Sequence, residues 1–142
     1  MNQGDDMSDA KALVQEFCDR MANRDAEALR GFIADDAIYQ NVGMAASVGV
    51  DAIVANLAGQ IGMFPDSYKY EMKNIAADGD VVLTERLDFI SVPGGAPVGL
   101  PVMGTFVVRD GKIVSWRDYF DLGLPGKMLS GEDVSGLIPQ AY

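Results

Sequence analysis

The second half of the chain constrains the fold most, because almost all of it has the composition of β-strand. β-Branched and aromatic residues, bounded by turn residues, predict four strands there: 67–75, 82–90, 99–109 and 112–122. Asp-Gly turns follow the first and the third of these strands, and a proline- and glycine-rich loop follows the second. Four consecutive strands joined in this way predict a largely antiparallel meander.

The first half is mainly helical, as the spacing of its apolar residues indicates. We expect a loose leader over 1–7, a helix from a cap at Ser8 or Asp9 to about Ala22, and a short helix from Asp25 to about Ile33. A strand over 37–42, a loop over 43–50 and a helix from Asp51 to Pro65 follow. After the four strands, we expect an irregular tail over 123–142 with at most one helical turn. Helices that segregate from an antiparallel sheet predict a single α+β domain over 1–142. In it, a strongly curved mixed, mostly antiparallel sheet would wrap around helices as a cone with an internal pocket.

The composition narrows the classes of partner and of chemistry. The formal net charge of −10 argues against nucleic acid and anionic membranes as partners, since both require basic surfaces. We find no signal peptide and no run long enough to span a bilayer, and we therefore expect a cytoplasmic protein. The chain has no histidine and one cysteine, Cys18, which falls on an apolar helical stripe and is expected to be buried. Without histidine, catalysis must use carboxylates, Tyr, Lys, Arg or the backbone, and His-based metal sites are excluded.

The strand over 82–90 carries two charged residues on a face that otherwise belongs to a core. Side chains alternate along a strand, so Arg86 and Asp88 share their face with three uncharged residues, Val82, Thr84 and Ile90. A buried charge is costly unless it is paired and hydrogen-bonded. These two residues therefore need either a partner or a function.

A second acid points to the same interior from the last strand. Asp118 shares its face with apolar residues such as Trp116. The turn before that strand allows two registers. In the first, a two-residue loop places Met103 opposite Asp118. A three-residue loop places Val102 there, and Gly104 opposite Trp116. Because the even-numbered residues of the preceding strand are apolar, we favour the three-residue loop with those residues inward.

Arg86 can bridge the two aspartates across the intervening strand. Two strand spacings amount to roughly 10 Å between backbones, which an arginine side chain can span with its planar fork. One alternative is a buried salt bridge of Asp88, Arg86 and Asp118 that only closes the core. Buried ion clusters stabilise weakly, however, and two carboxylates around one cation leave a surplus negative charge. Protonating one acid removes the surplus and leaves a general acid beside a general base.

Three short segments together resemble the limonene epoxide hydrolase family. They are Tyr39-Gln40-Asn41, Thr84-Glu85-Arg86-Leu87-Asp88 and Trp116-Arg117-Asp118-Tyr119-Phe120-Asp121-Leu122. The similarity runs from roughly Val14 to Leu122, with the segments in the same order and at near-equal spacing, and the loop over 43–50 departs from it. The resemblance implies the cystatin-like, nuclear-transport-factor-like cone and a homodimer.

The same resemblance implies a role for each site residue. Asp118 would deprotonate a water, which Tyr39 and Asn41 would hold. Asp88 would protonate the epoxide oxygen, and Arg86 would orient both acids. The implied reaction adds water to a small apolar epoxide in one step, giving a vicinal diol without a cofactor, a metal or a covalent intermediate. Core packing explains the candidate walls of the substrate pocket at least as well as ligand contact does: Ile90, Leu100, Val102, Trp116, Phe120 and Phe64.

Two other functions remain open on the same fold. A proton-transfer enzyme of the ketosteroid isomerase or polyketide cyclase type needs a lone base and a neutral oxyanion donor, and an arginine between two aspartates is not that arrangement. A non-catalytic ligand-binding or dimerisation module would not need these five polar side chains to converge. We therefore expect an epoxide hydrolase.

Overall fold

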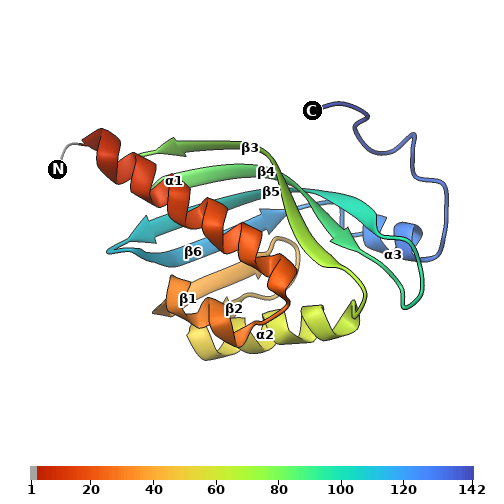
Figure 1. Cartoon of the computed structure of the whole chain (residues 1–142), viewed down its shortest axis with the longest axis horizontal. Helices are drawn as coiled ribbons and strands as arrows, with labels where there is room; N and C mark the ends of the chain where they lie inside the picture. The colour runs from red at the N-terminus through yellow and green to blue at the C-terminus, as the bar shows by residue number, and fades with distance from the viewer. Residues whose placement is uncertain (1–2) are drawn as a thin grey trace.

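A curved six-stranded sheet forms the body of the protein (Figure 1). The computed structural model describes residues 3–142, with side chains from residue 9 onward. The strands are β1 Ile33–Asn41, β2 Ser47–Val48, β3 Tyr68–Asp78, β4 Val81–Ile90, β5 Val98–Arg109 and β6 Lys112–Tyr119. Their order is β2-β1-β6-β5-β4-β3, in which β1 and β6 run parallel and the other four pairs are antiparallel. The predicted mixed, mostly antiparallel α+β architecture is confirmed.

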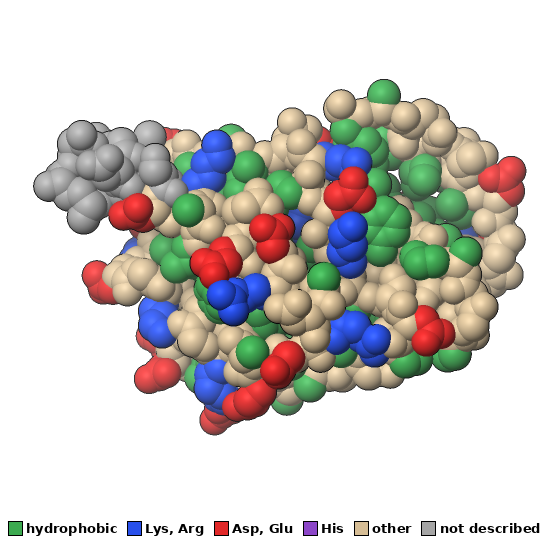
Figure 2. Space-filling view, in the orientation of Figure 1, with side chains coloured by type: hydrophobic (Ala, Val, Ile, Leu, Met, Phe, Trp, Pro, Cys, Tyr) green, Lys and Arg blue, Asp and Glu red, His purple; other side chains and the backbone are tan. Residues whose placement is uncertain are grey.

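Helices pack against one face of the sheet and leave the other face open. The helical elements are α1 Gln3–Asp19, the 3₁₀ turns η1 Arg20–Asn23 and η2 Glu27–Phe32, α2 Val50–Met63 and α3 Leu124–Leu129. In Figure 1, α1 crosses the strands diagonally, α2 lies below β1 and β2, and α3 lies at the far end beside the C-terminal segment. Acidic and basic side chains are interspersed on the face that Figure 2 shows. Within residues 3–142, no helix has both the length and the apolar character needed to cross a membrane.

Trp116 lies at the centre of the core between α1 and the sheet. Its ring meets Phe17 edge-on at 5.2 Å between centroids, and it stacks on Phe106 at 5.4 Å and on Tyr39 at 3.9 Å. Such aromatic pairs contribute about 0.5–1.5 kcal/mol each beyond the burial of their surface. Cys18 is buried in the same core, as expected, and burial raises the pKa of its thiol to about 12.

The first helix begins earlier than its capping residues suggested. α1 starts at Gln3 rather than at a cap on Ser8 or Asp9. Residues 3–7 are therefore helical instead of a loose leader, and residues 1–2 lie outside the described part of the chain. Adding a turn to a formed helix costs less than nucleating a new one, and no proline interrupts this stretch.

Other elements also differ from the prediction: β3 continues to Asp78 rather than ending at residue 75, and β6 ends at Tyr119 rather than at residue 122. β1 begins at Ile33 rather than at residue 37, because an irregularity in its pairing before Ile38 lets Asp35 and Asp36 both face solvent. The short strand β2 lies inside the expected loop and pairs with β1. In the tail, α3 has six residues and so exceeds the single turn expected there.

The turn between β5 and β6 has the two-residue form and not the three-residue form that we favoured. Arg109 pairs with Lys112, and Asp110 and Gly111 have φ values of 52° and 73°. Positive φ at both central positions is what a type I′ hairpin turn requires, and Asp-Gly adopts it readily. The first register considered is therefore correct next to the turn.

A β-bulge in β6 then changes the pairing farther along. Val114 is an extra residue, since Val108 pairs with Ile113 and Val107 with Ser115. The bulge keeps the predicted even-numbered face of β5 inward. However, it places Gly104 opposite Asp118, where we had expected Val102. The predicted inward residues of β5 are buried: Leu100, Val102, Phe106 and Val108.

Candidate active site

Arg86 is the centre of a fully hydrogen-bonded cluster inside the cone. Its side chain is entirely buried on the inward face of β4. Asp88 accepts from Nε at 3.0 Å and from Nη2 at 2.9 Å, and Asp118 accepts from Nη1 at 3.2 Å and from Nη2 at 2.9 Å. The fifth N–H, on Nη1, donates to the Thr84 hydroxyl at 3.1 Å, and Thr84 in turn donates to the Gly104 carbonyl at 3.0 Å. All five donors of the guanidinium are therefore satisfied.

Gly104 makes this bridge possible. It lies on β5 between Thr84 of β4 and Asp118 of β6. A Cβ atom at this position would lie 2.5 Å from Oδ1 of Asp118 and would collide with Nη1 of Arg86. The guanidinium thus occupies the space that an inward side chain of β5 would fill, which is how Arg86 reaches across a whole strand.

Asp118 accepts hydrogen bonds from three N–H donors. Besides the two bonds from Arg86, Oδ1 accepts a hydrogen bond from the Trp116 indole Nε1 at 2.8 Å. Asp118 is 2% exposed, yet it reaches the wall of a cavity. A buried carboxylate next to an open cavity can accept a proton from a molecule bound there.

Asp88 has an environment that favours its neutral form. Burial raises its pKa from the ordinary value to about 6, the attraction of Arg86 opposes this rise, and the negative charge of Asp118 adds to it. Among the described side chains, only Arg86 donates hydrogen bonds to Asp88, whereas Asp118 also accepts one from Trp116. The two aspartates thus differ in the way that an acid and a base in one site must differ.

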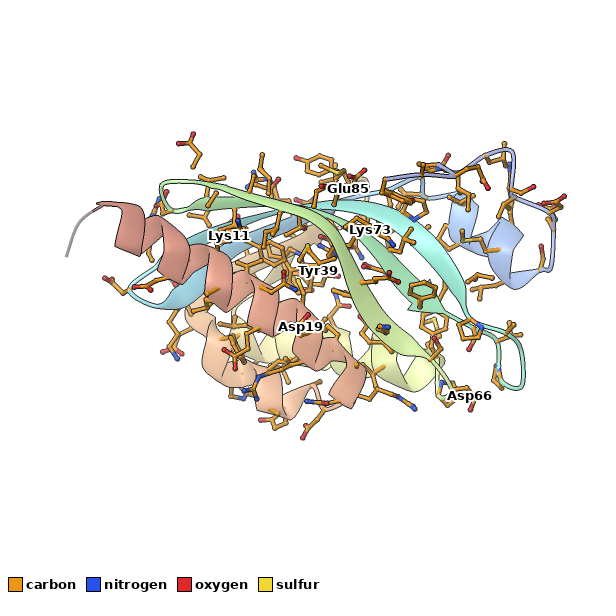
Figure 3. The ribbon with its side chains drawn as sticks, turned by 45° about the horizontal axis from the view of Figure 1, so that its top comes forward. Lys11, Asp19, Tyr39, Asp66, Lys73 and Glu85 are labelled. Atoms are coloured by element: carbon orange, nitrogen blue, oxygen red, sulfur yellow. The ribbon has the colours of Figure 1, made fainter. Side chains whose placement is uncertain are left out.

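Tyr39 and Asn41 lie beside Asp118 because β1 pairs with β6 in parallel. In this pairing Tyr39 is level with Trp116, and Asn41 is level with Asp118. The Tyr39 hydroxyl donates to Oδ1 of Asn41 at 3.1 Å and accepts from Gln60 Nε2 at 3.1 Å. Burial raises the pKa of Tyr39 well above its usual range, so the phenol stays neutral. Figure 3 shows Tyr39 in the interior of the molecule, between the sheet and the helices.

A cavity of about 400 Å³ opens next to these residues. Four of the five predicted catalytic residues line it, and Arg86 is buried behind them: Tyr39, Asn41, Asp88 and Asp118. Five of the six predicted wall residues also line it: Ile90, Leu100, Val102, Phe120 and Phe64. Trp116 does not, because it lies behind Tyr39 in the core. Exposed side chains form the outer part of the wall: Met44, Met63 and Leu122.

Sequence reasoning missed several residues of this cluster. Strand alternation placed Thr84 on the inward face with Arg86, but not its hydrogen bonds to Arg86 and to the Gly104 carbonyl. Gly104 required the true register of β6. Gln60 comes from α2, and only the packing of that helix on the sheet brings it to Tyr39 and Tyr68.

The comparisons with known proteins place this chain in a family. Residues 8–130 match the family model described as the limonene-1,2-epoxide hydrolase catalytic domain. The epoxide hydrolase EphG of Mycobacterium tuberculosis is 34% identical over 112 residues, which are 77% of this chain and 71% of that protein. A solved structure of an M. tuberculosis LEH-like epoxide hydrolase is 32% identical and has a TM-score of 0.73, covering 94% of this chain and 98% of that one.

Another solved structure shares the fold at lower identity. The SnoaL-like polyketide cyclase from Jannaschia sp. CCS1 has a TM-score of 0.79 at 17% identity, over 92% of this chain and 98% of that one. This likeness extends to the fold alone. The family model and the relatives above 30% identity go further, and they show that this chain belongs to the limonene-1,2-epoxide hydrolase family.

Proposed function

We propose that the protein is a cofactor-independent epoxide hydrolase that adds water to an apolar epoxide in a single step. The observation that carries the proposal is one buried guanidinium that holds two aspartates in different environments at the end of a mostly apolar cavity. Asp118 would act as the base and Asp88 as the acid. The apolar wall formed by residues such as Leu100 and Phe120 would hold the hydrocarbon part of the substrate.

The hydrogen-bond directions define how the water would be held. Since Oδ1 of Asn41 accepts from Tyr39, the amide nitrogen of Asn41 is available to donate to the oxygen of a water. That water would donate one proton to Asp118, and a lone pair of its oxygen would remain free to attack. Tyr39, held by Gln60, would fix the orientation of Asn41.

The bonds and protons of the proposed step balance. The water oxygen forms a bond to one oxirane carbon while the C–O bond of that carbon breaks. Asp118 accepts the proton that the water loses, and Asp88 gives its proton to the oxygen that leaves the carbon. The product is a vicinal diol. Exchange with solvent after the diol leaves returns a proton to Asp88 and removes one from Asp118.

A panel of cyclic terpene epoxides and aryl epoxides tests this function. We expect hydrolysis to the vicinal diol, measured by chromatography and mass spectrometry, without added metal or cofactor. If none of the epoxides is turned over, the proposal fails. The next assay would then be isomerisation of an enone, because a proton-transfer enzyme on this fold would catalyse it.

The proposal predicts that kcat/KM falls as the pH rises above about 6. Asp88 must carry a proton to act as the acid, and its raised pKa of about 6 keeps it protonated below that pH and ionised above it. The measurement is kcat/KM against pH for one epoxide, with circular dichroism at each pH as the control for folding. A rate that rises from pH 6 to pH 8 would remove Asp88 from the role of acid.

A homodimer is also part of the proposal. On the sheet face opposite the helices, side chains from three strands are nearly half exposed: Leu83, Met103 and Tyr119. A second copy of the chain would cover them. Sedimentation equilibrium would then give twice the mass of the chain, and a monomer at micromolar concentration would contradict it.

A further inference from the structure

Two tyrosine hydroxyl groups line the cavity without a direct contact to the groups that react in the proposed step. Tyr68 and Tyr70 point inward from β3, are 4% and 5% exposed, and have their hydroxyl oxygens 3.1 Å apart. Across the β3–β4 ladder, Tyr70 is paired with Asp88 and Tyr68 with Ile90. The hydroxyl pair therefore comes from the strand directly beside the proposed acid.

The direction of the hydrogen bonds leaves the Tyr70 oxygen as an acceptor. The hydroxyl of Tyr68 donates its only proton to Oε1 of Gln60 at 2.8 Å. Tyr70 must then be the donor in the bond between the two tyrosines. Among the residues whose side chains are described, none donates a hydrogen bond to the Tyr70 oxygen. Both phenols stay neutral, because burial raises their pKa values well above the usual range.

The Tyr68 hydroxyl orients Gln60, which holds Tyr39, but a purely apolar ligand gives no reason for the hydroxyl group of Tyr70. Phenylalanine at both positions would fill the same wall, and a phenyl ring at position 70 would still lie under the Arg86 guanidinium, which is 4.5 Å from the Tyr70 ring. The hydroxyl groups instead bring a desolvation cost, which their mutual hydrogen bonds only offset. Much of the rest of the cavity is apolar, with walls such as Leu100, Val102 and Phe120. The cavity therefore has more polar groups at this end than binding a water and an oxirane requires.

We propose that the Tyr70 oxygen accepts a hydrogen bond from a hydroxyl group of the substrate, so that the preferred substrates are epoxy alcohols. This inference rests on the proposed epoxide hydrolase function. Tyr70 and Asp88 are directly opposite each other on neighbouring strands, about 4.8 Å apart at the backbone, and both line the cavity. We therefore place the substrate hydroxyl within a few bonds of the oxirane. The apolar remainder of the substrate extends toward Met44, Met63 and Leu122.

A matched pair of substrates tests the subsite. One is a cyclohexene oxide with a hydroxyl on the carbon next to the oxirane, assayed as each diastereomer, and the other is its methyl ether, which cannot donate. We expect the native protein to prefer the better alcohol over its ether by about tenfold in kcat/KM, as one buried hydrogen bond would provide. In Tyr70→Phe the ratio should fall to about one. Tyr142→Phe, at a tyrosine that is nearly half exposed and does not line the cavity, should keep the native ratio and rate.

The possible outcomes separate the subsite from the function. Turnover of both substrates with no preference in the native protein overturns the subsite, and so does a preference that Tyr70→Phe retains. Turnover of neither substrate overturns the proposed function itself. An altered absolute rate in Tyr70→Phe does not affect the test, because the ratio of two substrates on one variant is the measured quantity.

Discussion

Replacing Asp118 with asparagine will lower kcat/KM for an epoxide by about 10³- to 10⁴-fold, the upper part of the range for the loss of a general base. The amide has the size of the carboxylate but cannot take a proton from water. It also offers one acceptor oxygen to the N–H donors of Arg86 and Trp116, so we expect the free energy of unfolding to fall by about 1–3 kcal/mol. Steady-state kinetics and urea unfolding measure the two effects.

Asp36→Asn is the matched control for this variant. Asp36 is exposed on β1, so the same chemical change there should leave both rate and stability near their native values. Near-native activity in Asp118→Asn would remove Asp118 from the mechanism. A variant that has lost its fold by circular dichroism would leave kinetics uninformative, and the comparison would then move to Asp118→Ser.

Replacing Arg86 with lysine will cost about 3–5 kcal/mol of stability and at least 100-fold in activity. Lysine keeps the positive charge, but its three donors on one atom cannot replace two parallel pairs and a bond to Thr84. The change breaks buried charge pairs while both carboxylates stay in the interior, and this is the costly case for a buried ion pair. Without the fork, Asp88 and Asp118 also lose their fixed positions relative to the substrate.

The control is Arg109→Lys, at a surface arginine that pairs with Asp80 at 3.3 Å. Exposed pairs contribute little, so this variant should unfold within about 1 kcal/mol of the native protein. Urea unfolding and epoxide turnover are measured on both variants. A fully stable and active Arg86→Lys protein would mean that a point charge is enough, and that the bridging geometry has no importance.

Much of the site followed from local patterns in the sequence. Alternation along β4 is a local property, so the inward position of Arg86 and Asp88 could be predicted without the fold. The same holds for Asp118 on β6. The general spacing between neighbouring strands was then enough to propose that Arg86 reaches from β4 across one strand to Asp118.

The parts that could not be predicted depend on non-local pairing. The two-residue turn shifts the pairing of β5 and β6 by one residue relative to the three-residue turn, and the bulge at Val114 shifts it again. The even-numbered residues of β5 therefore still face inward, but the residue opposite Asp118 is Gly104. A residue pattern shows the face but not such a pair of compensating shifts. For the same reason, the contact of Gln60 with Tyr39 could not be foreseen, since it depends on how α2 packs on the sheet.

The central claim is that Asp118 activates a water that attacks the epoxide directly. A single turnover in oxygen-18 water, with enzyme in excess over epoxide, tests it most directly. The account predicts that the diol formed in this first turnover carries one oxygen-18 atom and that the protein carries none. An unlabelled diol, with the label on the carboxyl group of Asp88 or Asp118 in the recovered peptide, would reveal a covalent intermediate and contradict the account.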